Sequence, residues 1–260
     1  MRKGLLVVWL VILAGLMTGG EWMQRSDFKI YYGQASAQVV QQLSAYPLVI
    51  VEPNAWSTPQ LQTLTATSAV YGYVNVMEME PAYELPTKAR LQVAGKPVAI
   101  PAWDTYMLDL TRDDVQQALT AKVERLAHGG YTGVFLDTVG DIDDYLADHP
   151  QVQASQREAL REWLGRMQAR FPDLDWLQNR GFATYIDTSQ AFVKRVLWED
   201  FRAKEIREDQ WSRDWLKRLQ ATDAKLYAVC ADSASLAEAK RQGMLVTYNP
   251  NDVYDVVQGR

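Results

Sequence analysis

Short apolar runs alternate with amphipathic segments along most of the 260-residue chain. Most of these runs are continuously apolar, which is typical of strands buried on both faces of a parallel sheet. The runs that we interpret as strands are residues 29–33, 47–53, 70–76, 133–139, 174–181, 195–201, 225–231 and 244–250.

The segments between the runs carry helix signals. One helix should begin with Ser57 or Thr58 as its cap and Pro59 in its first turn. In a second, Thr111 and Asp114 have the spacing of a capping box, and a Gly-Gly pair follows the apolar face. The segments that we interpret as helices are residues 36–46, 57–64, 111–130, 151–170, 208–221 and 233–243.

Strand–helix alternation on this scale predicts a single-domain (β/α)8 TIM barrel over residues 28–260. A doubly wound open sheet is the alternative, but no glycine-rich phosphate loop follows any of the runs. Residues 77–110 form an unusually long connection, which favours a functional role. Within it, residues 105–110 could add a ninth strand.

The N-terminus has the pattern of an export signal. Arg2 and Lys3 precede an uncharged apolar stretch from Gly4 to Met17, and small residues follow at 18–20. We expect residues 1–20 to be a cleaved signal peptide or an uncleaved membrane anchor, because the stretch is short for a membrane span of about 20 residues. The protein should therefore be secreted or otherwise extracytoplasmic, with membrane contact only through this segment.

Composition narrows the possible partners. The formal net charge of −5 and the absence of a basic run argue against nucleic-acid binding. Aromatic residues make up 11% of the chain, which suits either core packing or flat surfaces for sugar rings. Cys230 is the only cysteine, so no disulfide framework is expected.

Acidic and aromatic side chains stand at the ends of several predicted strands. In a (β/α)8 barrel these ends form the mouth that holds the active site. Carboxylates occur there as Glu52, Glu78, Asp137, and Glu199 with Asp200. Any one of them alone could be a cap or an ion-pair partner, but together they indicate an acidic site.

Other chemistries fit the sequence less well. The two histidines, His128 and His149, have neither metal-binding spacing nor a place at a strand end. Asp141, Asp143 and Asp144 could form an oxygen-ligand metal site, but a solvated loop is the simpler interpretation. Paired-carboxylate chemistry is what remains, and we expect no metal and no cofactor.

The chain resembles glycoside hydrolase family 114, the endo-α-1,4-polygalactosaminidase-like proteins, over nearly all of residues 28–250. The resemblance rests on the ordered motifs YYG, VIVEP, GYVNVMEME, GYTGVFLDTVG, LQNRG and VLWEDF. It implies a (β/α)8 barrel and assigns the catalytic roles to Asp137 and Glu199 by their motifs. Met77 is a departure, because the resemblance implies a glycine before the first glutamate of the third motif.

One strand should separate Asp137 from Glu199, which places their Cα atoms about 10 Å apart. That spacing is compatible with either retention or inversion of the sugar configuration. Our hypothesis makes Asp137 the nucleophile or electrostatic stabiliser and Glu199 the general acid, since Glu has the higher reference pKa. The residues expected to bind substrate are Tyr32, Glu52, Asn75, Glu78, Trp103, Asn179, Tyr227 and Tyr248.

An acidic barrel mouth would attract a cationic amino-sugar polymer, although a neutral α-linked glycan would also fit. Together with the resemblance, which implies cleavage of α-1,4-linked galactosamine polymers, this leads us to expect a monomeric hydrolase of galactosamine-type polysaccharide. The alternative is an exported polysaccharide-binding protein that has the same barrel but little or no turnover.

Overall fold

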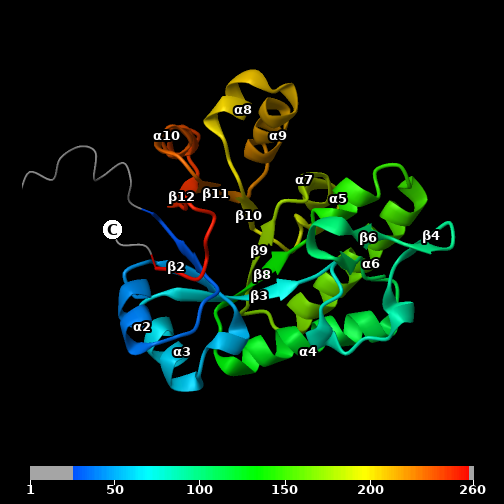
Figure 1. The fold of residues 1–260 in the computed structure, drawn as a ribbon, viewed down its shortest axis with the longest axis horizontal. Helices are drawn as coiled ribbons and strands as arrows, with labels where there is room; N and C mark the ends of the chain where they lie inside the picture. Colours follow the sequence, from blue (N-terminus) through cyan, green and yellow to red (C-terminus); the bar gives the residue numbers. More distant parts are fainter. Residues whose placement is uncertain (1–25, 258–260) are drawn as a thin grey trace, which may run out of the picture.

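The computed structural model describes residues 26–257 and forms a (β/α)8 barrel (Figure 1). All eight predicted strands are present, and they lie in chain order in one parallel sheet, β1-β2-β3-β8-β9-β10-β11-β12. The bounds are β1 Lys29–Tyr31, β2 Leu48–Val51, β3 Ala69–Asn75, β8 Gly133–Asp137, β9 Asp175–Asn179, β10 Arg195–Trp198, β11 Lys225–Cys230 and β12 Leu245–Tyr248.

The residues just before β1 join the two edges of this sheet. The backbone N–H of Asp27 donates to the carbonyl of Val246 in β12 at 2.6 Å. The Asp27 carboxylate accepts the N–H of Val246 at 2.9 Å. The sheet is therefore a nearly closed barrel, and the open doubly wound alternative is wrong because the strand order never reverses.

Two apolar layers explain why the strands are continuously apolar. In β8, Phe135 belongs to the cluster inside the barrel, whereas Val134 and Leu136 belong to the cluster under the helices. Alternate residues of a strand point to opposite faces, and both faces are covered here. This alternation also decides which strand-end side chains point into the mouth.

Each predicted helical segment contains a helix, and within residues 26–257 three further short helices follow β8, β9 and β10. Their bounds are α2 Ala37–Leu43, α3 Thr58–Thr65, α4 Asp113–Gly129, α5 Asp141–Tyr145, α6 Pro150–Arg170, α7 Phe182–Thr184, α8 Ala203–Glu208, α9 Gln210–Gln220 and α10 Ser233–Arg241, with short turns η1 Pro53–Ala55, η2 Pro81–Tyr83, η3 Thr87–Ala89, η4 Pro101–Trp103 and η5 Tyr185–Ser189. Among residues 26–257, no helix is long and apolar enough to cross a bilayer. The predicted signal or anchor at residues 1–20 lies outside the described part of the chain.

Of the two helix starts predicted from capping patterns, the structure has one as predicted and the other not. Ser57 caps α3 in a capping box, because its N–H donates to the Gln60 side chain at 3.0 Å. The capping box predicted for α4 is wrong. The Thr111 hydroxyl donates to Asp109 at 2.7 Å instead of capping the helix, which begins after Arg112.

The long connection after β3 forms a lobe beside the mouth, at the right in Figure 1. It contains two short antiparallel pairs, β4 Gln92–Val93 with β5 Lys96–Pro97, and β6 Ala99–Ile100 with β7 Thr105–Tyr106. Residues 105–106 therefore pair within the lobe and add no ninth strand to the barrel. Met77 is fully buried and ties the lobe to β3, since its carbonyl accepts the N–H of Leu108.

Candidate active site

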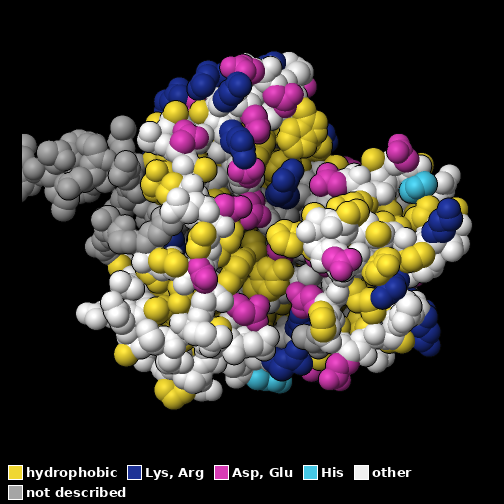
Figure 2. Space-filling view, in the orientation of Figure 1, with side chains coloured by type: hydrophobic (Ala, Val, Ile, Leu, Met, Phe, Trp, Pro, Cys, Tyr) yellow, Lys and Arg dark blue, Asp and Glu magenta, His cyan; other side chains and the backbone are white. Residues whose placement is uncertain are grey.

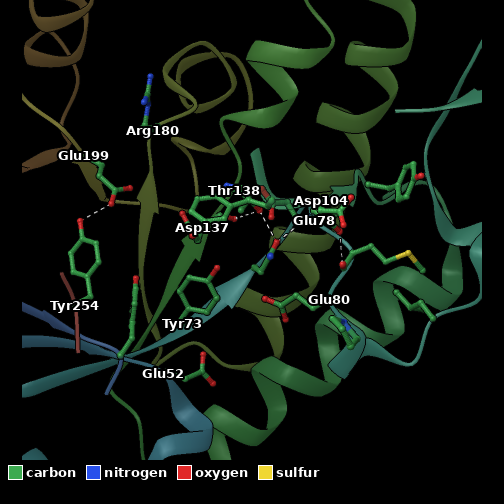
Figure 3. A pocket seen from close by; sticks show the side chains of 18 of the residues that line it. Glu52, Tyr73, Glu78, Glu80, Asp104, Asp137, Thr138, Arg180, Glu199 and Tyr254 are labelled. Carbon is green, nitrogen blue, oxygen red and sulfur yellow. Dashed lines mark hydrogen bonds between the residues drawn. The ribbon is translucent and has the colours of Figure 1, made fainter. Parts of the chain in front are cut away.

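An open cavity of about 1110 Å³ lies at the carboxyl ends of the strands (Figure 3). Figure 2 shows acidic side chains along a hollow near the middle of this face. Among the described residues, nine acids line the cavity against two arginines, Arg90 and Arg180. The acids are Glu52, Glu78, Glu80, Glu84, Asp104, Asp137, Glu199, Asp200 and Asp252.

Strand parity brings Asp137, Asn179 and Glu199 to the inner face of the mouth. Each stands two residues after an interior residue of its strand, namely Phe135, Leu177 and Leu197. Because side chains repeat their direction every second residue, all three point inward just above the barrel core. A shift of one residue in any of these strands would bury the polar side chain under the helices.

The amide of Asn179 joins the two carboxylates. Its Nδ2 donates to Oδ1 of Asp137 at 2.8 Å and to Oε2 of Glu199 at 2.7 Å. The two accepting oxygens are therefore no more than 5.5 Å apart, the sum of those two distances. Asn179 is 6% exposed, and its Oδ1 has no hydrogen-bond donor among the described residues.

Tyrosine hydroxyls surround the same two carboxylates. Tyr254 donates to Oε1 of Glu199 at 2.7 Å, and burial together with the charge of nearby Asp137 raises the pKa of Tyr73 far above its usual range. Tyr32 packs edge-on against Tyr73, with ring centroids 5.3 Å apart. Burial, followed by the charges of Asp137 and Glu199, raises the pKa of Tyr32 well above its usual range, so it stays protonated.

Burial raises the pKa of Glu199, and the nearby charge of Asp137 acts in the same direction. The hydrogen bonds from Tyr254 and Asn179 oppose this rise by favouring the charged carboxylate. Glu199 therefore holds its proton to higher pH than an exposed glutamate, as a group that donates a proton near neutral pH must do.

A second acidic pair lies on the far side of Asp137. Burial, then the charges of Asp137 and Glu80, raises the pKa of Glu78 to about 7. Burial, then the charges of Glu78 and Asp137, raises the pKa of Asp141 to about 8, and no donor within residues 26–257 bonds its Oδ2. Both carboxyls are therefore at least partly protonated near neutral pH, and a nearby cation would favour their charged forms.

Three adjacent strands end in strained backbone. The residue directly after each inward-facing polar position has a left-handed conformation: φ is 63° at Thr138, 50° at Arg180 and 60° at Asp200. A β-branched residue such as Thr138 rarely adopts a positive φ. Its hydroxyl accepts the N–H groups of Val76 and Met77 at 3.1 and 2.8 Å, which holds the conformation. Such strain is often concentrated where side chains must be aimed at a ligand.

Most of the residues predicted to bind substrate line the cavity: Tyr32, Glu52, Asn75, Glu78 and Trp103. Two of these side chains also have structural contacts. The Asn75 amide oxygen accepts the N–H of Glu78 at 2.9 Å. The Glu52 carboxylate accepts the N–H of Asn54 at 3.1 Å and caps η1.

Tyr227 and Tyr248 do not line the cavity, so the structure does not support their assignment to substrate binding. Tyr227 is 2% exposed and packs on Phe28 inside the barrel, with ring centroids 5.3 Å apart. Tyr248 has the parity of Val246 and packs against the outer core under the helices. The prediction considered how near each residue is to a strand end but not which face of the strand it occupies. Tyr248 occupies the outer face and therefore points away from the mouth.

Sequence reasoning missed Tyr73 and Tyr254. Tyr73 could have been found, because it stands two residues before Asn75 on the same face of β3. Tyr254 lies beyond the last strand, and no local pattern marks it.

The Asp141–Asp144 segment begins helix α5 and is not a solvated loop. Asp143 forms an ion pair with Arg157 at 2.8 Å and accepts the N–H groups of Ala183 and Thr184. Within residues 26–257, no group of three or more His, Cys, Asp or Glu side chains has a geometry that could hold a metal ion.

A (β/α)8 barrel whose inward strand ends carry a close pair of partly buried carboxylates has the arrangement of a glycoside hydrolase. Sequence comparison agrees, because residues 19–244 match glycoside-hydrolase family GH114. The match spans most of the chain, and the protein therefore belongs to this family. No curated protein sequence gave a significant match.

Solved structures show the same fold. The glycoside hydrolase domain of PelA from Pseudomonas aeruginosa is 20% identical, with a TM-score of 0.72 over 89% of this chain and 97% of that domain. Ega3 from Aspergillus fumigatus, solved in complex with galactosamine, is 12% identical, with a TM-score of 0.63 over 89% of this chain and 95% of Ega3. The α-galactosidase TtGalA from Thermus thermophilus is 12% identical, with a TM-score of 0.58 over 90% of this chain and 63% of that enzyme.

Proposed function

We propose that this protein hydrolyses α-1,4-linked galactosamine-containing polysaccharide with retention of configuration, using Asp137 as nucleophile and Glu199 as acid and base. The observation that carries the proposal is the Asn179 amide, which keeps the accepting oxygens of the two carboxylates within 5.5 Å. Retaining enzymes hold their carboxyl groups about 5–5.5 Å apart, whereas inverting enzymes need about 6.5–9.5 Å to admit a water molecule.

In the first step, protonated Glu199 donates its proton to the glycosidic oxygen while Asp137 attacks the anomeric carbon. The glycosidic bond breaks, and a covalent glycosyl–Asp137 ester forms. In the second step, Glu199 takes a proton from water, whose oxygen attacks the same carbon and releases Asp137. The raised pKa of Glu199 supports its role as the acid of the first step.

The charge of the cavity supports an amino-sugar substrate. Nine acids against two arginines, counted among the described residues, create a field that attracts ammonium groups. Glu78 is 8% exposed and lines the cavity. An ammonium group beside it would offset the burial that raises its pKa. The galactosamine found with Ega3 belongs to that protein and agrees with this substrate class.

We also propose that the enzyme acts outside the cytoplasm as a monomer, delivered by residues 1–20. The charged and apolar pattern of that segment supports export. Fractionation of the expressing cells, with mass measurement of the mature chain, tests both delivery and cleavage. Light scattering on the purified protein tests the monomer.

The deciding experiment incubates the purified protein with a partly deacetylated α-1,4-linked N-acetylgalactosamine polymer and follows oligosaccharide release. We expect release by the wild-type protein and a loss of about 10²–10⁴-fold in Asp137→Asn and Glu199→Gln. Proton NMR during the first turnovers should show the α-anomer of the new reducing end before mutarotation. The β-anomer appearing first would exclude retention.

Binding without release would instead support the alternative, a polysaccharide-binding protein on the same barrel. Thermal stability of each variant within a few degrees of wild type serves as the folding control. Full activity in both variants would end the two-carboxylate proposal.

A further inference from the structure

The segment after the last strand folds back over the barrel mouth. The N–H of Tyr32 donates to the carbonyl of Tyr254 at 2.6 Å, and the two rings lie with centroids 5.4 Å apart. Within the segment, the N–H of Val253 donates to the buried Asn249 side chain at 3.3 Å. These contacts fix the segment on the end of β1.

Gly33 makes this close approach possible. A Cβ added at Gly33 would lie 2.8 Å from the backbone carbonyl oxygen of Asp255 and 2.6 Å from the hydroxyl of Tyr31. Both distances are too short for a real side chain. A residue with a side chain at position 33 would therefore prevent the C-terminal segment from packing here as it does.

The docked segment places Tyr254 and Asp252 in the cavity wall. The Tyr254 hydroxyl donates to Oε1 of Glu199 at 2.7 Å, while Asn179 donates to Oε2 at 2.7 Å from the other side. Both oxygens of Glu199 are therefore held, which fixes the plane of its carboxyl group. Figure 3 shows the Tyr254 hydroxyl pointing at the neighbouring Glu199 carboxylate.

We propose that the C-terminal segment completes the active site, with Tyr254 as a positioning residue that orients Glu199. The inference rests on the proposed role of Glu199 as acid and base. The family match ends at residue 244, so the segment that carries Tyr254 lies beyond the matched region.

The charged and titratable groups around Glu199 determine in which direction its pKa should shift when the Tyr254 hydroxyl is removed. Burial and the charges of Asp137 and Asp252 favour the protonated form of Glu199, whereas Tyr254 and Asn179 donate to its charged form. Tyr32 faces it from β1 and stays protonated, and Arg180 lines the cavity from the end of β9. Removing the Tyr254 hydroxyl takes away a donor to the carboxylate, so the pKa of Glu199 must rise further.

The test is a carbon-13 NMR titration of the Glu199 carboxyl in the full chain, with the signal assigned by its loss in Glu199→Gln. We expect Tyr254→Phe to raise the pKa of Glu199 by about one unit. The alkaline limb of the pH profile of kcat/KM should shift to higher pH by the same amount, because Glu199 stays protonated to higher pH. The value of kcat should fall while KM changes little.

Tyr185→Phe is the matched control. The Tyr185 hydroxyl donates to the buried carbonyl of Val193 at 3.3 Å and lies outside the cavity wall. This variant loses a buried hydroxyl without touching Glu199, so the titration should not move. Gly33→Ala is a second test, because it displaces the segment and should shift Glu199 in the same direction as Tyr254→Phe.

An unchanged Glu199 titration in both Tyr254→Phe and Gly33→Ala would overturn the inference, and so would lower activity with an unchanged pH profile. The titration needs no substrate, which separates this outcome from failure of the proposed function. If the titration shifted but the protein released no oligosaccharide, the proposed hydrolytic function would be contradicted, while the coupling between Tyr254 and Glu199 would stand.

Discussion

Asn179 donates to Glu199 at 2.7 Å through the same nitrogen that donates to Asp137. Two like charges this close repel each other, and a shared donor between them lowers that repulsion. Asn179 was predicted to bind substrate, but its donor hydrogens are already committed to the two carboxylates. Its Oδ1 has no hydrogen-bond partner among residues 26–257, but the atom is buried and Asn179 does not line the cavity, so the structure supports a bridging role rather than a direct contact with a sugar.

Replacing Asn179 by alanine should lower kcat/KM by about 10²–10³-fold, the usual cost of losing one preorganised donor. The chain should remain folded, because the change only removes polar atoms at the mouth. Steady-state kinetics and a thermal melt check both statements. Gln190→Ala is the control, since its exposed amide bonds only the carbonyl of Ile186. Activity of Asn179→Ala within threefold of wild type would contradict the bridging role.

Asp141 should make stability depend on pH. The folded state raises its pKa from 3.8 to about 8, so the folded protein binds this proton more tightly than the unfolded chain. The contribution of protonated Asp141 to the free energy of unfolding is therefore fully present below pH 3.8 and is lost as the pH rises toward 8.

Asp141→Asn should therefore be more stable than wild type at pH 8, by an amount on the order of 1–3 kcal/mol, with little difference near pH 4. Denaturant melts at the two pH values measure this. Asp113→Asn, at an exposed position in the first turn of α4, should show no such gain. Equal effects at both pH values would show that the charge of Asp141 is not the cause.

Substrate binding should weaken with salt if ammonium groups are attracted by the acidic cavity. Raising the salt concentration from about 0.01 to 0.5 M shortens the screening length from roughly 30 to under 8 Å. We expect KM for a deacetylated oligosaccharide to rise several-fold over that range. KM for the fully N-acetylated oligosaccharide should stay constant, and a parallel rise for both would remove the electrostatic argument.

Trp103 is 74% exposed on the cavity rim, which suits stacking against a sugar ring. Trp103→Ala should raise KM for long chains about 2–10-fold and leave kcat and the melting temperature unchanged. Trp211 is 51% exposed but packs on Phe182 outside the cavity wall, with ring centroids 6.1 Å apart. Trp211→Ala should do the opposite, lowering the melting temperature with no change in KM.

Much of the barrel could be predicted because strand and helix patterns are local. The continuously apolar runs require cover on both faces, which a parallel sheet under helices provides. Strand ends and motif order singled out Asp137 and Glu199, and both carboxylates line the cavity. Tyr227 and Tyr248 were misassigned because a position near a strand end gives neither the depth of a side chain nor its face.

The sequence by itself determined the eight strands, their order and the acidic character of the mouth, since each depends on residues close in the chain. Tertiary structure alone decided which of those side chains meet. The Asn179 bridge depends on the register of three strands, and the Tyr254 contact joins residues 55 positions apart. Such distances are set by barrel closure and by the return of the C-terminal segment, because no short-range pattern encodes a contact between separate strands.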